Sequence, residues 1–526
     1  MIPRRWLYVF LAALTLLRLA FAAQLELFPD ESYYFQWSER MDICYFSKGP
    51  GVAWAIWLGT HLLGVNELGV RVLSPLCGLG TSLLLFSFAR RLYGESAGLW
   101  TAVMINLLPI FNVGSLVMTI DTLSIFFWTA ALYTFWLALE RSPDFSKWWP
   151  ATGALIGLGF LAKYTNAMAL VSVLLVLAVT PKFRREFRRP GCWTLLATFA
   201  LCTLPPIVWN ARHEWVTLDH LKDRGGLHQG FAIHPGEFAA FFGLHFAVYS
   251  PLIFLGMLVA AWWGIRRARQ QWKPRFLLAF SLPLFALYGW LSLKQAGEPN
   301  WTAPAVISLG VLAVAFWHER AATSRGARIF SVAALAGGLV GSVLILNLDG
   351  VRAAGIDWSY RRDPGSRMRG WRTAAAKVEA LRAEFEAQLG EKVFLIANEH
   401  EVASSLAFYM QEKRPEGPAH PPVYIPESQA FVDQFSFWHR YDEFVDEKDA
   451  PHIPRDEYFT EEGGVNPFMG RTALYITDRP EEKAPSAIKG GFEQVEMIAC
   501  LDQTRRGMPL RQLRVFACRR YRSLPL

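Results

Sequence analysis

The chain has 526 residues, of which 52% are hydrophobic, 14% aromatic and 19% charged. Counted with glycine and without tyrosine, the apolar share is about 57%, whereas soluble domains have about 45–50%. The charged share of this chain is lower than the roughly 25% of soluble domains. Residues 1–349 carry 28 Lys and Arg against 18 Asp and Glu, whereas residues 350–526 carry 25 against 27. This composition excludes a single soluble domain, a disordered protein and a disulfide miniprotein. It also argues against nucleic-acid binding, which needs a basic patch on a soluble face.

Eleven apolar segments approach the length of about 17–25 residues that crosses a bilayer. They are Trp6–Ala23, Leu68–Ala89, Ala97–Met118, Thr122–Leu139, Pro150–Leu161, Ala167–Thr180, Cys192–Trp209, Glu237–Trp263, Phe276–Leu293, Thr302–Trp317 and Ile329–Leu346. The first has a basic start and Ala20-Phe21-Ala22, as a signal peptide has, but we expect it to remain as a span. We therefore predict a polytopic α-helical membrane protein with about 11 transmembrane helices in residues 1–349.

Lys and Arg mark every second connection between the predicted spans. The basic connections are Arg4–Arg5, Arg90–Arg91, Arg141 with Lys147, Lys182–Arg189, Arg266–Arg275 and Arg320–Arg328. Because cytoplasmic loops are enriched in these residues, the N-terminus is predicted to be cytoplasmic. With eleven spans, residues from about Asp349 onward lie outside the cytoplasm, as do the loops 24–67, 210–236 and 294–301.

The periodicity changes near Arg369 and predicts a separate external α/β domain over residues 350–526. Helices are expected at Arg369–Leu389 and Glu401–Met410, and strands at Lys392–Ala397, Val423–Ile425, Ala473–Thr477, Gln494–Ala499 and Arg511–Ala517. Cys500 and Cys518 fall in two of these strands, where they either pair or stay free. We expect this domain to help acceptor selection rather than bond making.

The first external loop, residues 24–67, holds two adjacent carboxylates, Asp30 and Glu31, followed by Lys48. Taken alone, Asp30 is better explained as the N-cap of a helix running to about Arg40. The apolar second half of the loop, Gly51–Gly64, predicts a helix lying in the membrane interface.

Three further charges lie near the outer ends of predicted spans. Asp121 begins the fourth span, Lys163 ends the fifth and Lys294 ends the ninth. Each lysine alone is explained by snorkelling. Together with the three charges of the first loop, however, they place three cations and three carboxylates on one side of the membrane, as expected of a site for a phosphate and a hydroxyl.

The loop 210–236 contains four histidines, which are His213, His220, His228 and His234. Their spacing matches no standard zinc pattern, so polar loop residues are the default interpretation. No cofactor is assigned, and a divalent metal is not supported by the sequence.

Several short motifs resemble the membrane glycosyltransferases of the GT-C superfamily that use polyprenyl-phosphate sugars. This family contains the protein O-mannosyltransferases, the aminoarabinose transferase acting on lipid A and the Rgt-type galacturonosyltransferases. The motifs are Asp30-Glu31, Ser47-Lys48-Gly49-Pro50, Gly64–Glu67 with Arg71–Ser74, Arg90–Gly94, Leu161-Ala162-Lys163, Glu298-Pro299-Asn300-Trp301, Gly370-Trp371 and Ala403–Tyr409. Ser47 departs from the aminoarabinose branch, which tends to have Glu there, so a metal contact and the sugar of that branch are not implied.

The resemblance implies that an acceptor hydroxyl attacks the anomeric carbon, a carboxylate takes its proton and polyprenyl phosphate leaves. Asp30 is then the catalytic base. The expected contacts to donor phosphate or substrate are Glu31, Lys48, Asp121, Lys163, Lys294, Glu298 and Asn300. The partners implied are a polyprenyl-phosphate sugar, a lipid, glycan or protein acceptor and membrane lipids, in a bacterial inner membrane. A flippase or transporter of lipid-linked sugar or small solute is the alternative.

Overall fold

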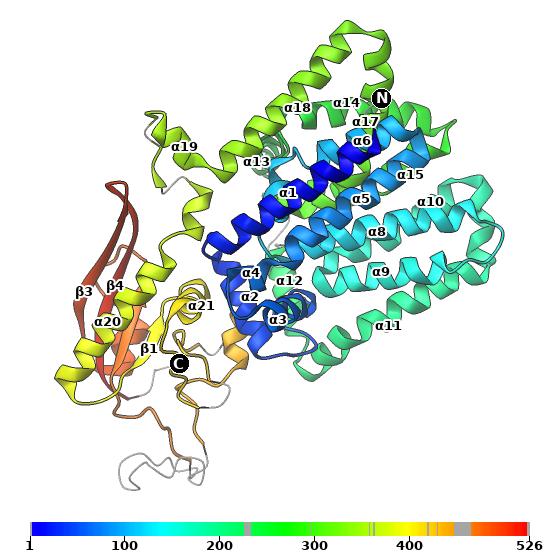
Figure 1. The fold of residues 1–526 in the computed structure, drawn as a ribbon. Helices are drawn as coiled ribbons and strands as arrows, with labels where there is room; N and C mark the ends of the chain where they lie inside the picture. Colours follow the sequence, from blue (N-terminus) through cyan, green and yellow to red (C-terminus); the bar gives the residue numbers. More distant parts are fainter. Residues whose placement is uncertain are drawn as a thin grey trace. The chain divides into compact units, whose positions relative to one another are not determined.

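A computed structural model describes residues 3–225, 233–295, 297–356, 358–360, 363–417, 420–428, 430–445 and 464–522 (Figure 1). Its contacts divide the chain into two compact units. The first comprises Met1–Gln24 and Met41–Ala354, and the second comprises Leu25–Arg40 and Gly355–Leu526. The first half of the first predicted external loop is therefore part of the same unit as the C-terminal domain.

The first unit is helical. Its elements are α1 (Arg4–Gln24), α3 (Gly51–Leu63), α4 (Glu67–Arg71), α5 (Leu73–Tyr93), α6 (Glu95–Ile105), α7 (Pro109–Gly114), α8 (Ile120–Glu140), α9 (Trp148–Ala162), η1 (Tyr164–Ala167), α10 (Met168–Val179), η2 (Pro181–Arg188), α11 (Pro190–Arg212), α12 (Val216–Arg224), α13 (Pro235–Val248), α14 (Pro251–Ala268), α15 (Trp272–Ala279), α16 (Leu282–Leu291), η3 (Pro299–Thr302), α17 (Ala303–Thr323), α18 (Arg325–Leu346) and α19 (Leu348–Ala353). In the described part of the chain, seven helices are long and apolar enough to cross a membrane, or nine if each of two bent pairs counts as one span. The predicted polytopic helical fold is confirmed.

Two predicted spans are broken in the structure. The segment Glu237–Trp263 is not one helix, because α13 and α14 meet at 114°. Ser250 between them has φ of +68°, and Pro251 begins α14. Proline disfavours helical backbone in the residue before it, so the break falls there. The segment Ala97–Met118 is likewise divided between α6 and α7, and Pro109 begins α7.

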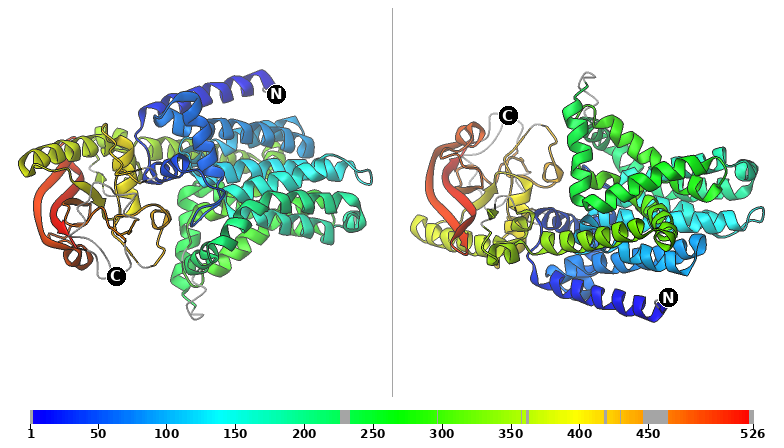
Figure 2. Two further views of the ribbon diagram at one scale, coloured as in Figure 1. Left: turned by 90° about the horizontal axis from the view of Figure 1, so that it is seen from below. Right: turned by 90° about the horizontal axis from the view of Figure 1, so that it is seen from above.

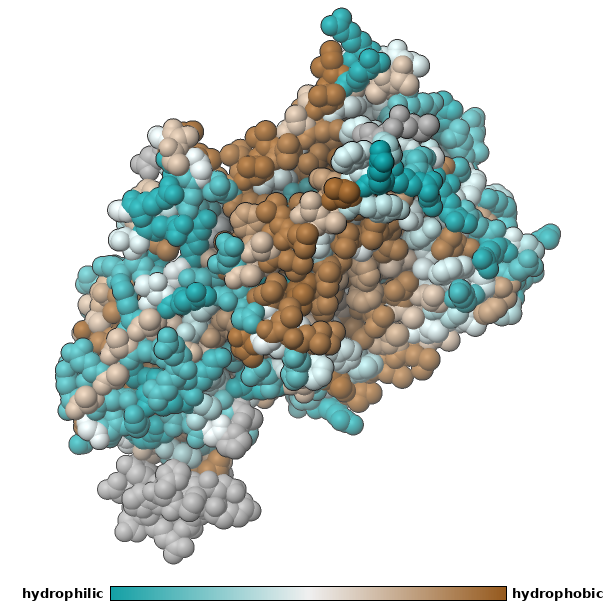
Figure 3. Space-filling view, viewed as in Figure 1, coloured by the Kyte–Doolittle hydropathy of each residue, from teal (hydrophilic) through white to brown (hydrophobic). Residues whose placement is uncertain are grey.

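Helix α8 is the central helix of the first unit. Of its most apolar 18-residue stretch, 78% is buried, compared with 17% for α18. Trp136 of α8 stacks on Trp272, with ring centroids 4.3 Å apart, and Phe135 stacks on Phe276. A helix that is apolar all round belongs inside a bundle. The exposed apolar side chains of the outer helices, seen as brown surface in Figure 3, suit contact with lipid.

The second unit is an α/β domain that includes the helix of the first loop. Its elements are α2 (Pro29–Glu39), η5 (Pro364–Met368), α20 (Trp371–Leu389), β1 (Phe394–Ala397), α21 (His400–Tyr409), η6 (Gln434–Phe437), β2 (Ala473–Thr477), α22 (Ser486–Gly491), β3 (Phe492–Arg505) and β4 (Met508–Tyr521). The sheet order is β1-β2-β4-β3, with β1 and β2 parallel and the other pairs antiparallel. Helix α20 packs against β3 and α21 (Figure 2).

The predicted elements of this domain are confirmed with two corrections. The expected strand Val423–Ile425 is a single bridge between Ile396 and Tyr424. The last two strands are longer than predicted, because Arg506 and Gly507 both adopt positive φ and close a tight hairpin.

Cys500 and Cys518 do not pair with each other. Cys518 faces Val495 across the hairpin, whereas Cys500 faces Arg514, so the two thiols stand at different register positions. Cys518 is buried and Cys500 exposed, and both are free.

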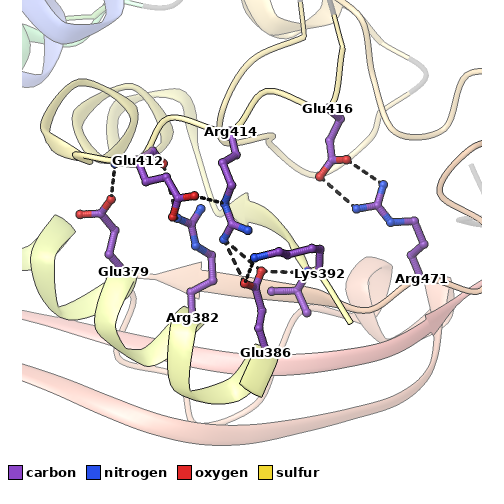
Figure 4. A network of polar contacts seen from close by, with 9 residues as sticks. Glu379, Arg382, Glu386, Lys392, Glu412, Arg414, Glu416 and Arg471 are labelled. Atoms are coloured by element: carbon purple, nitrogen blue, oxygen red, sulfur yellow. Dashed lines mark hydrogen bonds and ion pairs between the residues drawn. The ribbon is translucent and has the colours of Figure 1, made fainter. Parts of the chain in front are cut away.

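A charged network fixes α20 to the edge of the sheet (Figure 4). The carboxylate of Glu386 accepts hydrogen bonds from Arg414 at 3.0 and 3.1 Å and from the backbone N–H of Val393 at 3.0 Å. Lys392 lies 3.3 Å from the same carboxylate. The acids and bases of this network compensate one another, which is typical of a structural element rather than an anion site.

Candidate functional site

Asp121 stands in the first turn of α8. Thr119 is the N-cap of this helix, and its hydroxyl accepts a hydrogen bond from the N–H of Asp121 at 3.3 Å. A carboxylate in a first helical turn is stabilised by the helix dipole. The sequence Met118-Thr119-Ile120-Asp121 therefore places a carboxyl side chain at the start of a buried helix.

Lys163 stands where α9 ends. Its backbone is extended, and its N–H still donates to the carbonyl of Gly159 at 2.8 Å. The following 3₁₀ turn is tied to α8 by Asn166, whose side chain accepts from the Ser124 hydroxyl at 2.6 Å and donates to the Ser124 carbonyl at 3.0 Å. These bonds hold the end of α9 beside the start of α8.

The side chains of Asp121, Lys163 and Asn300 form one cluster. Lys163 Nζ lies 2.5 Å from Asp121 Oδ1, and Asn300 Nδ2 donates to Asp121 Oδ2 at 2.8 Å. The lysine side chain is 10% exposed and the aspartate side chain 18%. Both carboxylate oxygens already accept hydrogen bonds, so Asp121 orients the lysine ammonium and is poorly suited to act as a base in this state. An incoming phosphate would compete with Asp121 for Lys163.

Lys48 is placed by a tight turn beside the end of α9. Its backbone exchanges hydrogen bonds with Tyr45. The next residue, Gly49, packs so closely on α9 that a Cβ would overlap the carbonyl of Leu161. The half-buried lysine also contributes, after burial and Arg224, to lowering the pKa of His220 to about 4. His220 is therefore neutral at physiological pH.

Lys294 and Glu298 lie on the connection that leads to η3. Lys294 is half-buried and Glu298 is exposed. Asn300, two residues after Glu298, makes the contact to Asp121. The roles of Lys294 and Glu298 in substrate binding remain predictions.

Asp30 and Glu31 belong to α2 in the second unit. The N-cap of α2 is Phe28 and not Asp30, since Pro29 takes the first helical position. Glu31 is fully buried, and its Oε2 accepts a hydrogen bond from the N–H of Phe28 at 2.8 Å, which is the glutamate half of a capping box. Asp30 is half-buried. The capping interpretation thus applies to Glu31 and leaves Asp30 without that role.

Helix α2 is held by α21 and the segment around Phe435. The Tyr409 hydroxyl accepts from the N–H of Leu27 at 2.6 Å, just before α2. Phe35 packs edge to face on Phe408, and the Tyr33 hydroxyl accepts from the N–H of Gln434 at 2.7 Å. The helix that carries Asp30 is therefore a buried part of the C-terminal domain.

No group of three or more His, Cys, Asp or Glu side chains within the described ranges is arranged to hold a metal ion. Of the four loop histidines, His228 lies outside those ranges. His213 stacks on Trp209, with ring centroids 3.9 Å apart.

Four residues outside the predicted set make further polar contacts, two of them beside Asp121 and Lys163. Ser124 and Asn166 brace Asp121 and Lys163, and their signal in the sequence is a polar residue one turn from each charge. Asp433 pairs with His400 at 3.2 Å. No sequence pattern links these two residues, which lie 33 positions apart.

Taken together, the first unit is that of a multi-pass membrane protein with a buried acid–lysine–amide cluster where three helical elements end. Residues 47–209, which include Lys48, Asp121 and Lys163, match the family model described as dolichyl-phosphate-mannose-protein mannosyltransferase. The matched segment includes α8 and α9, which carry Asp121 and Lys163, two of the three residues of the cluster.

Curated relatives are similar over a little more than half of the chain. The lipid A galacturonosyltransferase RgtD of Rhizobium johnstonii is 30% identical over 292 residues, or 55% of this chain and 60% of that protein. The undecaprenyl phosphate-alpha-4-amino-4-deoxy-L-arabinose arabinosyl transferase of Edwardsiella ictaluri is 27% identical over 321 residues, or 54% of each chain. The chain thus spans little more than half the length of these relatives.

The whole chain has the fold of ArnT from Cupriavidus metallidurans. The crystal structure of that protein bound to undecaprenyl phosphate matches with a TM-score of 0.60 and 17% identity, over 97% of this chain and 98% of the other. Its apo structure matches with the same TM-score at 16% identity, over 98% of each chain. The predicted resemblance to polyprenyl-phosphate-sugar-dependent glycosyltransferases is confirmed.

Proposed function

We propose that the protein is a membrane glycosyltransferase that moves a sugar from a polyprenyl-phosphate donor to an acceptor hydroxyl or phosphate outside the cytoplasm. The observation that carries the proposal is the cluster of Asp121, Lys163 and Asn300. In this cluster the ammonium group of Lys163 is held at the end of a helix by Asp121. Asp121 and Lys163 both lie in the segment that matches the mannosyltransferase family model.

Each charged residue has its own proposed role. Lys163 and Lys48 supply positive charge for the departing phosphate, which needs neutralisation as it leaves. Asp30 accepts the proton of the acceptor hydroxyl, which requires an ionised carboxylate within hydrogen-bond reach in the substrate complex. Asp121 and Asn300 orient Lys163 for this exchange.

The substrates follow from the relatives by analogy. RgtD and the arabinosyl transferases are named for lipid A and for an undecaprenyl-phosphate-linked sugar. We therefore propose undecaprenyl phosphate as the carrier and lipid A as the acceptor. Both a hexosyl and a pentosyl transferase are represented among these relatives, so the donor sugar is left to experiment.

The membrane arrangement is proposed from loop charges. The alternating Lys and Arg content of the loops favours a cytoplasmic N-terminus in a bacterial inner membrane and a periplasmic C-terminal domain. This arrangement puts the predicted outer loops on the side where lipid-linked donors are used.

Donor turnover by purified protein tests the function. The full chain in lipid nanodiscs is incubated with a panel of undecaprenyl-phosphate hexoses and pentoses and with lipid A, and released undecaprenyl phosphate is measured. We expect release with one donor and sugar transfer to lipid A. Movement of intact donor across vesicles without release would favour the flippase alternative and contradict the proposal.

A further inference from the structure

Tyr33 links the helix that carries Asp30 to the C-terminal domain. It lies three residues after Asp30, and residues three apart share a face of a helix. Its ring is 5% exposed and packs on the imidazole of His400, with centroids 4.4 Å apart. Its hydroxyl accepts from the backbone N–H of Gln434. His400 therefore lies directly against the turn of α2 that carries Asp30.

His400 is paired with a carboxylate that is itself fixed. Nδ1 of His400 lies 3.2 Å from Oδ2 of Asp433, whose side chain is 11% exposed. The other oxygen, Oδ1, accepts from the N–H of Phe435 at 2.9 Å and caps the 3₁₀ turn η6. The pair therefore joins α21 to η6, and both of these elements contact the ring of Tyr33.

The pair is not explained by the stability of α21. His400 is the first residue of α21, where a positive charge opposes the helix dipole. The ring packs on Tyr33, so a charge on His400 also lies close to α2.

Carboxylates surround His400 from each element packed against it. They are Asp433 beside η6, Glu399 and Glu401 at the start of α21, and Asp30 on α2, where Tyr33 is the other titratable group. Burial lowers the pKa of His400, but the hydrogen bond and charge of Asp433, together with Glu401 and Asp30, outweigh burial and raise this pKa above its ordinary value. The protonated imidazole is therefore favoured at this position relative to a free histidine side chain.

We infer that His400 is a positioning residue: its imidazolium, paired with Asp433 and stacked on Tyr33, holds the start of α2 and thereby the carboxylate of Asp30. The inference rests on the proposed role of Asp30 as the base. It also makes the first loop sensitive to pH through the C-terminal domain. Since the pKa of His400 is raised on folding, the stabilisation is complete below its unfolded value near 6.5 and is lost as pH rises through the folded value.

Hydrogen exchange of α2 tests this coupling without any substrate. Amide exchange of residues 29–39 is measured in the full chain at about pH 6 and about pH 9, corrected for the intrinsic pH dependence of exchange. We expect opening of α2 to be about fivefold more frequent at the higher pH, which is the upper end of the effect of a solvent-exposed ion pair. His400→Gln should show the high-pH opening at both pH values.

Two variants provide the comparison. Asp433→Asn keeps the cap of η6, because Asn caps as well as Asp, and should reproduce the effect of His400→Gln; the double variant should be no worse than either single one. His439→Gln is the matched control, since His439 forms a similar pair with Glu443 at 3.0 Å on an exposed surface. It should leave α2 exchange unchanged.

The outcomes separate the inference from the proposed function. Equal α2 exchange in the parent and His400→Gln at both pH values would overturn the inference, whatever the activity. If α2 responds, we expect kcat/KM for the donor to fall toward alkaline pH in the parent and in His439→Gln, but not in His400→Gln. A pH response of α2 in a protein that turns over none of the donors would refute the proposed function but leave the coupling standing.

Discussion

Removing one partner of the Asp121–Lys163 pair is expected to destabilise the protein, whereas removing both is expected to restore it. The pair is largely buried, with side chains 10% and 18% exposed, and Lys163→Ala leaves the carboxylate with Asn300 as its remaining partner in the cluster. Stranding a buried charge costs about 3–5 kcal/mol, and the residual exposure favours a value of about 3 kcal/mol. The double variant Asp121→Asn with Lys163→Met leaves no stranded charge and should recover most of this loss.

The assay combines unfolding in mixed micelles with donor turnover. If the pair serves only structure, the double variant should be both stable and active. Our account predicts instead that the double variant is stable but releases no undecaprenyl phosphate, because the orientable cation is gone. Full activity of a stable double variant would refute the role of Lys163. A double variant as unstable as Lys163→Ala would refute the assigned coupling.

Three further predictions concern other parts of the chain. Lys48→Ala should raise the KM for the donor and lower kcat, since it removes charge that meets the phosphate before and during transfer; Lys222→Ala, an exposed lysine on α12, should change neither. Burial raises the pKa of Glu427 to about 8, although the Tyr521 hydroxyl donates to its carboxyl group at 2.6 Å. Because the folded state holds this proton more tightly than the unfolded state, the free energy of unfolding should fall by up to about 5 kcal/mol as the pH rises from about 4.5 to 8. Denaturation of Glu427→Gln should show a flatter pH dependence. A reporter active only in the periplasm should be active when fused after Leu526, and an inactive but well-inserted fusion would contradict the topology.

The helical fold could be predicted from hydropathy, but breaks within apolar segments could not. The mean apolar character of Glu237–Trp263 is unaffected by one proline, yet Pro251 and the positive φ of Ser250 turn the chain by 114°. The N-cap of α2 can also be predicted from the sequence. Proline at the first helical position and glutamate at the third indicate that the cap is Phe28.

The candidate site could be predicted as a set of charges on one side, but not as contacts. Asp121 and Lys163 lie 42 positions apart, and Asn300 lies far beyond them, so their meeting depends on tertiary packing. From the sequence, the C-terminal domain is predicted to be an acceptor-selecting domain separate from the first loop. The structure instead groups α2 with that domain, because Tyr33 and Phe35 bury their rings against α21 and η6.

Turnover by Asp30→Asn tests the central claim most directly. The substitution keeps the shape of the side chain and removes its charge, and Glu39→Gln, an exposed acid at the other end of α2, is the matched control. With the responsive undecaprenyl-phosphate sugar, our account predicts that release of undecaprenyl phosphate falls at least about 100-fold in folded Asp30→Asn, the low end for loss of a general base. Donor binding should be largely retained, and Glu39→Gln should behave as the parent. Parent-like turnover by Asp30→Asn would contradict the assignment of Asp30 as the catalytic base.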